Sequence, residues 1–139
     1  MVEWYWHIHH SSLFGILQRP IEERIAYIKA HKSKRQQKVR LSLIKPVKGK
    51  LPTMLVKAGE TYLKSAEADR IAWQNYLNTH ASKKVRDIHD KAQQKLRDDW
   101  TAYQEARKSC NDEVEALHRK ECPDCPWDGK TIFPRKVKA

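Results

Sequence analysis

The stretch Asn78-Thr79-His80-Ala81-Ser82 interrupts a long helical segment and decides whether the chain folds back on itself. Between residues 53 and 121 the sequence has one glycine and no proline, and most apolar residues recur at steps of three or four, as on one helix face. A continuous helix over this segment would be about 100 Å long. Ser82 or Thr79 can cap a second helix. We therefore expect an antiparallel helical hairpin, with a single helix that pairs with a second chain as the alternative.

The N-terminal part of the chain predicts a small module of strands and helices. Apolar and polar residues alternate over 2–10, which is typical of a strand. Pro20 fits the first turn of a helix, and isoleucines at helical spacing follow it, so we expect a helix over 20–31. Alternation over 39–43 predicts a second strand, and a loop follows at 45–52.

The C-terminal segment begins with Cys122-Pro123-Asp124-Cys125 and continues into a turn signal at Asp128-Gly129. Residues 131–133 can then add an edge strand. The sequence as a whole predicts an α+β protein. It divides into a basic strand-helix-strand module (1–52), a long helical hairpin or spacer (53–121), and a cysteine knuckle with a turn and a basic tail (122–139).

Two motifs near the ends of the chain carry residue types that bind zinc. His7 and His9 are two residues apart on the predicted strand, so their side chains should project from the same face. Cys122 and Cys125 form a C-x-x-C pair, which can grip one ion from a tight turn. Together the four residues predict a structural zinc site. Within one chain, this site requires the hairpin to bring the two ends together.

Other interpretations of these residues remain open. His118 lies one helical turn before Cys122 and can form a local site, which Cys110 or His10 would complete. The cysteine pair can instead be a redox dithiol, although redox pairs usually place the first cysteine at a helix N-terminus, whereas this pair follows a helix. The cysteines can also be unliganded thiols at a helix end, and the histidines can serve packing alone.

Positive charge is concentrated at one end of the sequence. The net charge is +11, and lysines and arginines cluster without an acid between residues 32 and 50. Such a stretch favours contact with phosphates, but no sequence-reading motif accompanies it. We expect nucleic acid or a nucleoprotein complex as partner, with an acidic protein partner or a merely solvated face as alternatives. The candidate binding residues are Lys32, Lys34, Arg35, Lys38, Arg40, Lys45, Lys48 and Lys50.

Several functional classes lack their usual sequence signatures. No apolar run approaches the ~20 residues of a transmembrane helix, and no signal-peptide core begins the chain, so we expect no membrane association and a cytoplasmic location. No glycine-rich phosphate loop, G-x-S-x-G or H-E-x-x-H motif is present. We therefore expect a binding protein rather than an enzyme. The alternatives are a structural protein that forms homo-oligomers through its long helices, and a metal-dependent hydrolase built on His7 and His9.

The two ends of the chain resemble an uncharacterised family of bacterial and phage proteins. The resemblance rests on the opening run from Trp4 to His10, on the stretches at residues 24–29 and 43–49, and on the closing run Cys-Pro-Asp-Cys-Pro-Trp-Asp-Gly-Lys-Thr-Ile-Phe-Pro at 122–134. It implies that the two ends form one unit spanned by a helical spacer of adjustable length. A phage-encoded member would act in the host cytoplasm.

Overall fold

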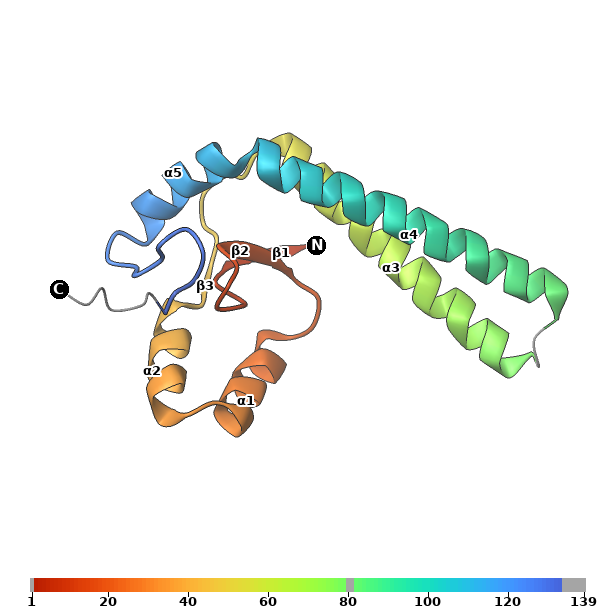
Figure 1. The fold of residues 1–139 in the computed structure, drawn as a ribbon, viewed down its shortest axis with the longest axis horizontal. Helices are drawn as coiled ribbons and strands as arrows, with labels where there is room; N and C mark the ends of the chain where they lie inside the picture. The colour runs from red at the N-terminus through yellow and green to blue at the C-terminus, as the bar shows by residue number, and fades with distance from the viewer. Residues whose placement is uncertain (1, 80–81, 134–139) are drawn as a thin grey trace. The chain divides into compact units, whose positions relative to one another are not determined.

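The computed structural model describes residues 2–79 and 82–133, and the chain forms two compact units (Figure 1). One unit, here called the end unit, combines residues 1–50 with residues 115–139. The other, the hairpin unit, comprises residues 51–114. The fold is α+β with a helical hairpin, as the sequence predicts. The two ends of the chain belong to the same unit, although the sequence division at residues 52 and 121 separates them.

A small antiparallel sheet lies in the end unit. Its strands are β1 (Glu3–Trp6), β2 (Phe14–Leu17) and β3 (Lys45–Pro46), in the order β2-β1-β3. The strand predicted over 2–10 ends early, because His7 adopts a left-handed backbone conformation with φ of 55° and turns the chain. β2 was not predicted, because it is a short apolar strand without clear alternation.

Two helices follow the β1–β2 hairpin. The expected helix is present as α1 (Ile21–His31), which begins directly after Pro20. The strand expected over 39–43 is wrong, because these residues end α2 (Lys34–Leu43). Ser33 caps this helix by accepting a hydrogen bond from the backbone N–H of Gln36. The apparent alternation arose because Arg40, a polar residue, points inward and is buried.

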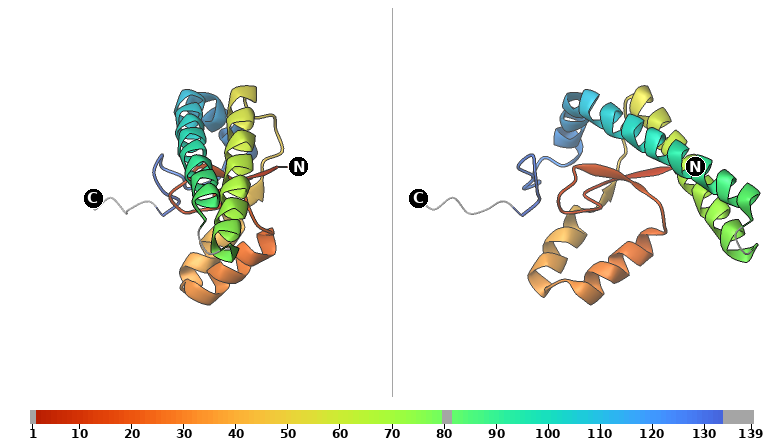
Figure 2. Two further views of the ribbon diagram at one scale, coloured as in Figure 1. Left: turned by 90° about the vertical axis from the view of Figure 1, so that its right-hand side faces the viewer. Right: turned by 45° about the vertical axis from the view of Figure 1, so that its right-hand side comes forward.

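The hairpin unit contains α3 (Thr53–Asn78) and α4 (Lys83–Ser109), which lie side by side in both views of Figure 2. The expected break is confirmed, and Ser82 caps α4 by accepting from the N–H of Val85. The helical segment ends at Ser109 rather than at residue 121, and α5 (Asn111–Glu121) follows after Cys110. None of the described helices is long and apolar enough to cross a membrane.

Aromatic side chains form two layers along the hairpin. Tyr62 of α3 packs against Trp100 and Tyr103 of α4, with ring centroids 4.9 and 5.7 Å apart. Farther along, Trp73 of α3 packs against His89 of α4. Each aromatic layer therefore contains one tryptophan, and Trp73 and Trp100 pack between the helices with 44% of their surface exposed.

The C-terminal segment closes the end unit. Asp128 accepts hydrogen bonds from the backbone N–H groups of Lys130 and Thr131, and Gly129 has a positive φ of 96°, so the expected turn is confirmed. The edge strand expected at 131–133 is absent from the described residues, which bend instead. The backbone N–H of Ile132 donates to the His10 carbonyl over 3.0 Å, which joins the two ends of the chain directly.

Candidate metal centre

Three side chains from distant parts of the sequence meet in the end unit. The Nε2 atoms of His7 and His118 are 3.0 Å apart, and the Cys125 sulfur lies 3.1 Å from the His7 Nε2. All three ligand atoms lie within 4.8 Å of one another. His7 and His118 are 0% and 5% exposed. These three residues lie close enough to hold a metal ion.

The backbone at the end of β1 orients His7. Its left-handed conformation turns the imidazole out of the strand direction, and its Nδ1 lies 3.3 Å from the Ser12 carbonyl oxygen. A carbonyl only accepts hydrogen bonds, so Nδ1 carries the proton and Nε2 presents its lone pair to His118 and Cys125. A backbone carbonyl that fixes the tautomer in this way is the usual support of a metal-binding histidine.

Helix α5 and the turn after it supply the other candidate ligands. His118 and Cys122 are one helical turn apart, and the Cys122 N–H donates to the His118 carbonyl over 2.7 Å. The Cys125 N–H donates to the Cys122 carbonyl over 3.2 Å, which closes a tight knuckle. Cys122 and Cys125 both line a pocket of about 330 Å³ together with His118. Cys122 therefore lines the same pocket, but its sulfur is not one of the three ligand atoms that lie within 4.8 Å of one another.

The protein surrounds the site with rings and apolar groups. The Trp6 ring lies 5.0 Å from His118, and the Trp127 ring lies 5.5 Å from His7. Burial, followed by the proximity of His118, lowers the pKa of His7 to about 4. Burial also lowers the pKa of His118. Both imidazoles are consequently neutral near pH 7, which is the form that binds metals.

The two thiols of the knuckle are not activated as nucleophiles. Burial raises the pKa of both Cys122 and Cys125. They follow the C-terminus of α5, where the helix dipole disfavours a thiolate. A redox dithiol needs the opposite environment, so the chemistry of this pair favours metal binding, in which coordination itself removes the thiol protons.

The other histidines and the third cysteine of the sequence analysis lie outside this group. His9 is exposed, and its Nδ1 accepts a hydrogen bond from Arg24 over 3.0 Å. The expected common face of His7 and His9 is wrong, because the strand ends before His7. His10 is exposed with its ring 5.9 Å from that of Phe133. Cys110 is buried within the hairpin unit.

Glu121 is a functional candidate that no sequence motif marks. Its carboxylate accepts the backbone N–H groups of Lys48 and Gly49 over 2.7 and 2.9 Å, and the indole N–H of Trp6 over 3.3 Å. Burial acts to raise the pKa of Glu121, but these hydrogen bonds outweigh it and the pKa is lowered. Glu121 directly precedes Cys122 and therefore ties the knuckle to the basic loop after β3.

Most of the predicted basic surface is exposed. Lys34, Arg35 and Lys38 are exposed on α2, whose first turn has no acidic residue, while Lys32 is half-buried. Arg40 is 1% exposed and donates to the Ile8 carbonyl, so its assignment to the binding surface is wrong. The exposed loop lysines are Lys45, Lys48 and Lys50.

A groove of about 700 Å³ runs beside α2 in the end unit. Ser33, Arg35 and Gln36 line one side, and Ile132 and Phe133 of the C-terminal segment line the other. The groove therefore contains both a guanidinium and an aromatic ring. Proteins that bind single-stranded nucleic acid use positive side chains to contact the phosphates and aromatic side chains to stack on the bases.

Comparisons of this chain with protein-family models, with curated protein sequences and with solved structures found no match. The resemblance of the chain ends to bacterial and phage proteins therefore stays a prediction.

Proposed function

We propose that the protein is a non-enzymatic binding protein in which a structural zinc ion joins the two ends of the chain and a basic face engages nucleic acid. The observation that carries the proposal is the convergence of His7, His118 and Cys125, with Cys122 in the lining of the same pocket. Two neutral imidazoles and two thiolates form one of the common structural zinc sites.

The spacing of the ligand atoms is compatible with zinc after a small adjustment. Tetrahedral zinc with bonds of ~2.0–2.3 Å holds its ligand atoms roughly 3.3–3.7 Å apart. The His7–His118 and His7–Cys125 distances of 3.0 and 3.1 Å are a few tenths of an ångström shorter. A rotation of the Cys122 side chain into the shared pocket would supply the fourth ligand. Four protein ligands leave no open position for water or substrate, which favours a structural role over hydrolysis.

The basic face supports nucleic acid as the partner. Lys34, Arg35 and Lys38 present three exposed positive charges on α2, and no acidic residue occurs between Glu23 and Glu60. Cations arranged in this way release counterions from phosphates and give sequence-independent, salt-sensitive binding. By joining Cys122 to the loop through Glu121, the proposed zinc site would also hold Lys48 in place.

The test is binding of an arbitrary duplex DNA at 50 and 200 mM salt. Three phosphate contacts predict a loss of affinity of about 40-fold between these concentrations. The triple variant Lys34→Gln, Arg35→Gln, Lys38→Gln should bind weakly. The matched triple variant Lys83→Gln, Lys84→Gln, Arg86→Gln removes the same charge from the hairpin unit and should bind like the unmodified protein. A flat response to salt, or equal losses in the two variants, would contradict the proposal.

A second candidate function is self-association through the hairpin unit. Several large apolar side chains of its two long helices are about half exposed, which is unusual for an isolated hairpin. They are Met54, Ile71, Trp73, Leu77, Ile88 and Trp100. Sedimentation across a hundredfold range of protein concentration tests this candidate, because an oligomer held by these side chains would dissociate on dilution or on Trp73→Ser substitution.

A further inference from the structure

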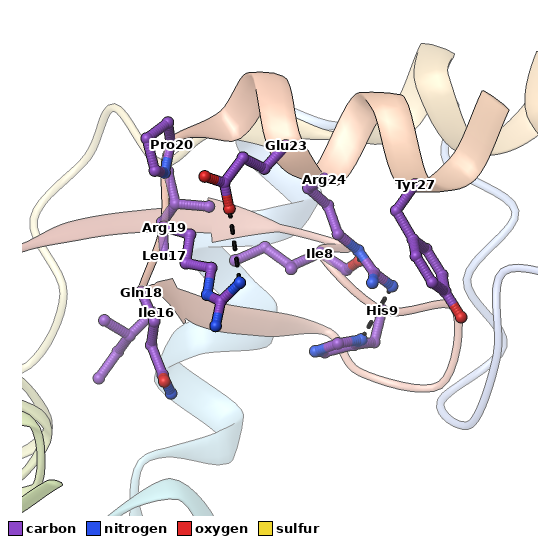
Figure 3. Close-up of a pocket in the computed structure, with 10 residues that line it drawn as sticks. All are labelled: Ile8, His9, Ile16, Leu17, Gln18, Arg19, Pro20, Glu23, Arg24 and Tyr27. Atoms are coloured by element: carbon purple, nitrogen blue, oxygen red, sulfur yellow. Dashed lines mark hydrogen bonds and ion pairs between the residues drawn. The ribbon is translucent and has the colours of Figure 1, made fainter. Parts of the chain in front are cut away.

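A pocket of about 410 Å³ lies beside α1 in the end unit and shares no lining residue with the metal centre (Figure 3). Its two ends differ in charge. Arg24 reaches toward His9 at one end, next to Tyr27, and Arg19 pairs with Glu23 over 3.7 Å at the other. The wall between them is apolar and comes from Ile8, Ile16 and Leu17.

The positive end of the pocket holds more charge than the described protein neutralises. The guanidinium groups of Arg24 and Arg40 both donate to the Ile8 carbonyl oxygen, each over 3.1 Å. In the described part of the chain no carboxylate forms an ion pair with either of them. Arg40 is 1% exposed, and its Nε has no hydrogen-bond partner among the described residues. Arg24 is half-exposed, and its guanidinium also contacts His9 and lies 5.2 Å from the centroid of the Tyr27 ring. An anion bound at Arg24 would reduce the repulsion between the two neighbouring cations.

Arg24 is placed to hold such an anion. A guanidinium has five N–H donors in a planar fork. The hydrogen bonds to Ile8 and His9 use two of them, which leaves three, and Arg24 lines the pocket where its neighbour Arg40 does not. Phosphate oxygens match the fork geometry of the remaining donors. Burial of Arg40 and the charge of Arg24 lower the pKa of Arg40, consistent with a positive end that lacks a counterion.

We propose that this pocket binds a nucleoside monophosphate, with the phosphate at Arg24 and the base along the apolar wall. The pocket volume lies within the range of ordinary ligand sites, roughly 300–1,000 Å³. Ile16 and Leu17 offer apolar contact to a base. At the far end Gln18 and Glu23 offer the amide and carboxylate groups that pair with the N–H and carbonyl groups of a base edge.

The pocket selects against simpler and larger anions. Inorganic phosphate would contact Arg24 and leave the apolar wall in water. At the far end Arg19 is already paired with the Glu23 carboxylate, so a second phosphate group would find no unpaired cation among these lining residues, and one anionic group is preferred over two. This site uses neither the zinc ligands nor the basic face of α2, and it therefore goes beyond the function proposed above.

Calorimetric titration of the full chain with the four nucleoside 5′-monophosphates tests the site. At least one of them should bind in a one-to-one ratio, and the matching nucleoside and inorganic phosphate should each bind roughly tenfold more weakly. Absence of binding by all four overturns the proposal. Equal affinity for inorganic phosphate would mean that the pocket is an anion site only, which also overturns it.

Two variants test whether the nucleotide binds in this pocket. Arg24→Lys keeps the charge but loses the fork, and Leu17→Trp fills the pocket without removing a polar contact. Each should weaken nucleotide binding roughly tenfold while the circular dichroism spectrum stays unchanged. Arg35→Lys on α2 is the control and should leave nucleotide binding unchanged. If folded Arg24→Lys and Leu17→Trp proteins both keep full affinity, the ligand binds elsewhere. Since the DNA test above uses different residues, either proposal can fail without the other.

Discussion

The Nε2 atoms of His7 and His118 lie 3.0 Å apart although 111 residues separate them in the sequence. One imidazole follows the first strand and the other belongs to the last helix, so this contact joins the beginning of the chain to its end. The backbone hydrogen bond from Ile132 to His10 makes a second such link. The two links explain why the residues flanking the hairpin unit form a single compact unit.

Single-histidine variants distinguish a zinc site that includes His118 from one that includes His9. We expect His118→Ala to lose most of its bound zinc, because the side chain contributes one of the three clustered ligand atoms. His9→Ala should keep its zinc, because the His9 ring contacts Arg24 instead. The measurement is zinc content by atomic emission on protein purified without an affinity tag. Loss of zinc in the His9 variant with retention in the His118 variant would restore the ligand set predicted from the sequence.

The metal-free protein should lose stability in mild acid. The pKa of His7 is lowered from 6.5 to about 4 by burial, so the unfolded chain takes up a proton that the folded protein resists. The stabilisation is complete above pH 6.5 and disappears as the pH falls toward 4. The whole pKa shift of His7 corresponds to about 3 kcal/mol in the free energy of unfolding. Urea unfolding of chelator-treated protein from pH 7.5 to 4 measures this, and in His7→Gln the slope over this interval should shrink.

Glu121 should stabilise the end unit through its three hydrogen bonds. Glu121→Ala leaves the backbone N–H groups of Lys48 and Gly49 and the Trp6 indole without their acceptor, and we expect a loss of about 2–4 kcal/mol in the free energy of unfolding. Hydrogen exchange at Lys48 and Gly49 should accelerate in the variant. Glu113→Ala, at an exposed position of α5, is the matched control. Unchanged exchange at both amides would show that the carboxylate does not hold the loop.

Gly49 leaves little room for a side chain beside Leu117 and Glu121. A Cβ at this position would collide with the end of the Leu117 side chain and lie 2.8 Å from the Glu121 carboxylate. Both are the ends of flexible side chains that can shift, so Gly49→Ala should lower the melting temperature by a few degrees, at the low end of the overpacking cost of about 1–3 kcal/mol. Gly129→Ala meets no atom within 4 Å but has a positive φ, so its effect should come from backbone strain alone. Equal melting temperatures for Gly49→Ala and the unmodified protein would contradict the packing described around Glu121.

The hairpin unit should unfold at alkaline pH. Burial raises the pKa of Tyr103 to about 12, so the neutral phenol stabilises the fold fully below pH 10 and this contribution is lost as the pH rises toward 12. Helix content followed by circular dichroism from pH 8 to 12 should fall in the unmodified protein. Tyr103→Phe cannot ionise, and its transition should move to higher pH. Identical transitions in the two proteins would assign the alkaline unfolding to other groups.

The regular parts of the fold were predictable from local patterns. The weak helical stretch before Ser82 marks the hairpin, because a capping residue there offers its oxygen to free backbone N–H groups. The strand predicted over 39–43 is wrong, and the local sequence pattern does not show the reason. Arg40 is a charged residue held inside by the Ile8 carbonyl, a partner 32 positions away.

The residue types of the candidate metal site were predictable from the sequence, but the particular residues that form it were not. The sequence predicted that His7 would meet the C-x-x-C pair, and the Cys125 sulfur lies 3.1 Å from the His7 Nε2. His118 was predicted only as part of a separate local site, and His9 lies outside the group. The choice of His118 over His9 depends on one residue, because the positive φ of His7 ends the strand and removes His9 from its face. A left-handed histidine has no sequence signature, and the acceptor role of Glu121 depends on contacts more than 70 positions away.

On the function proposed above, a zinc ion held by His7, His118, Cys122 and Cys125 would join the two ends of the chain. Native mass spectrometry of untagged protein, purified without chelator, tests it most directly. We predict about one zinc per chain in the unmodified protein and no bound zinc when Cys122 and Cys125 are both changed to serine. Less than about 0.2 zinc per chain after incubation with equimolar zinc would contradict the claim.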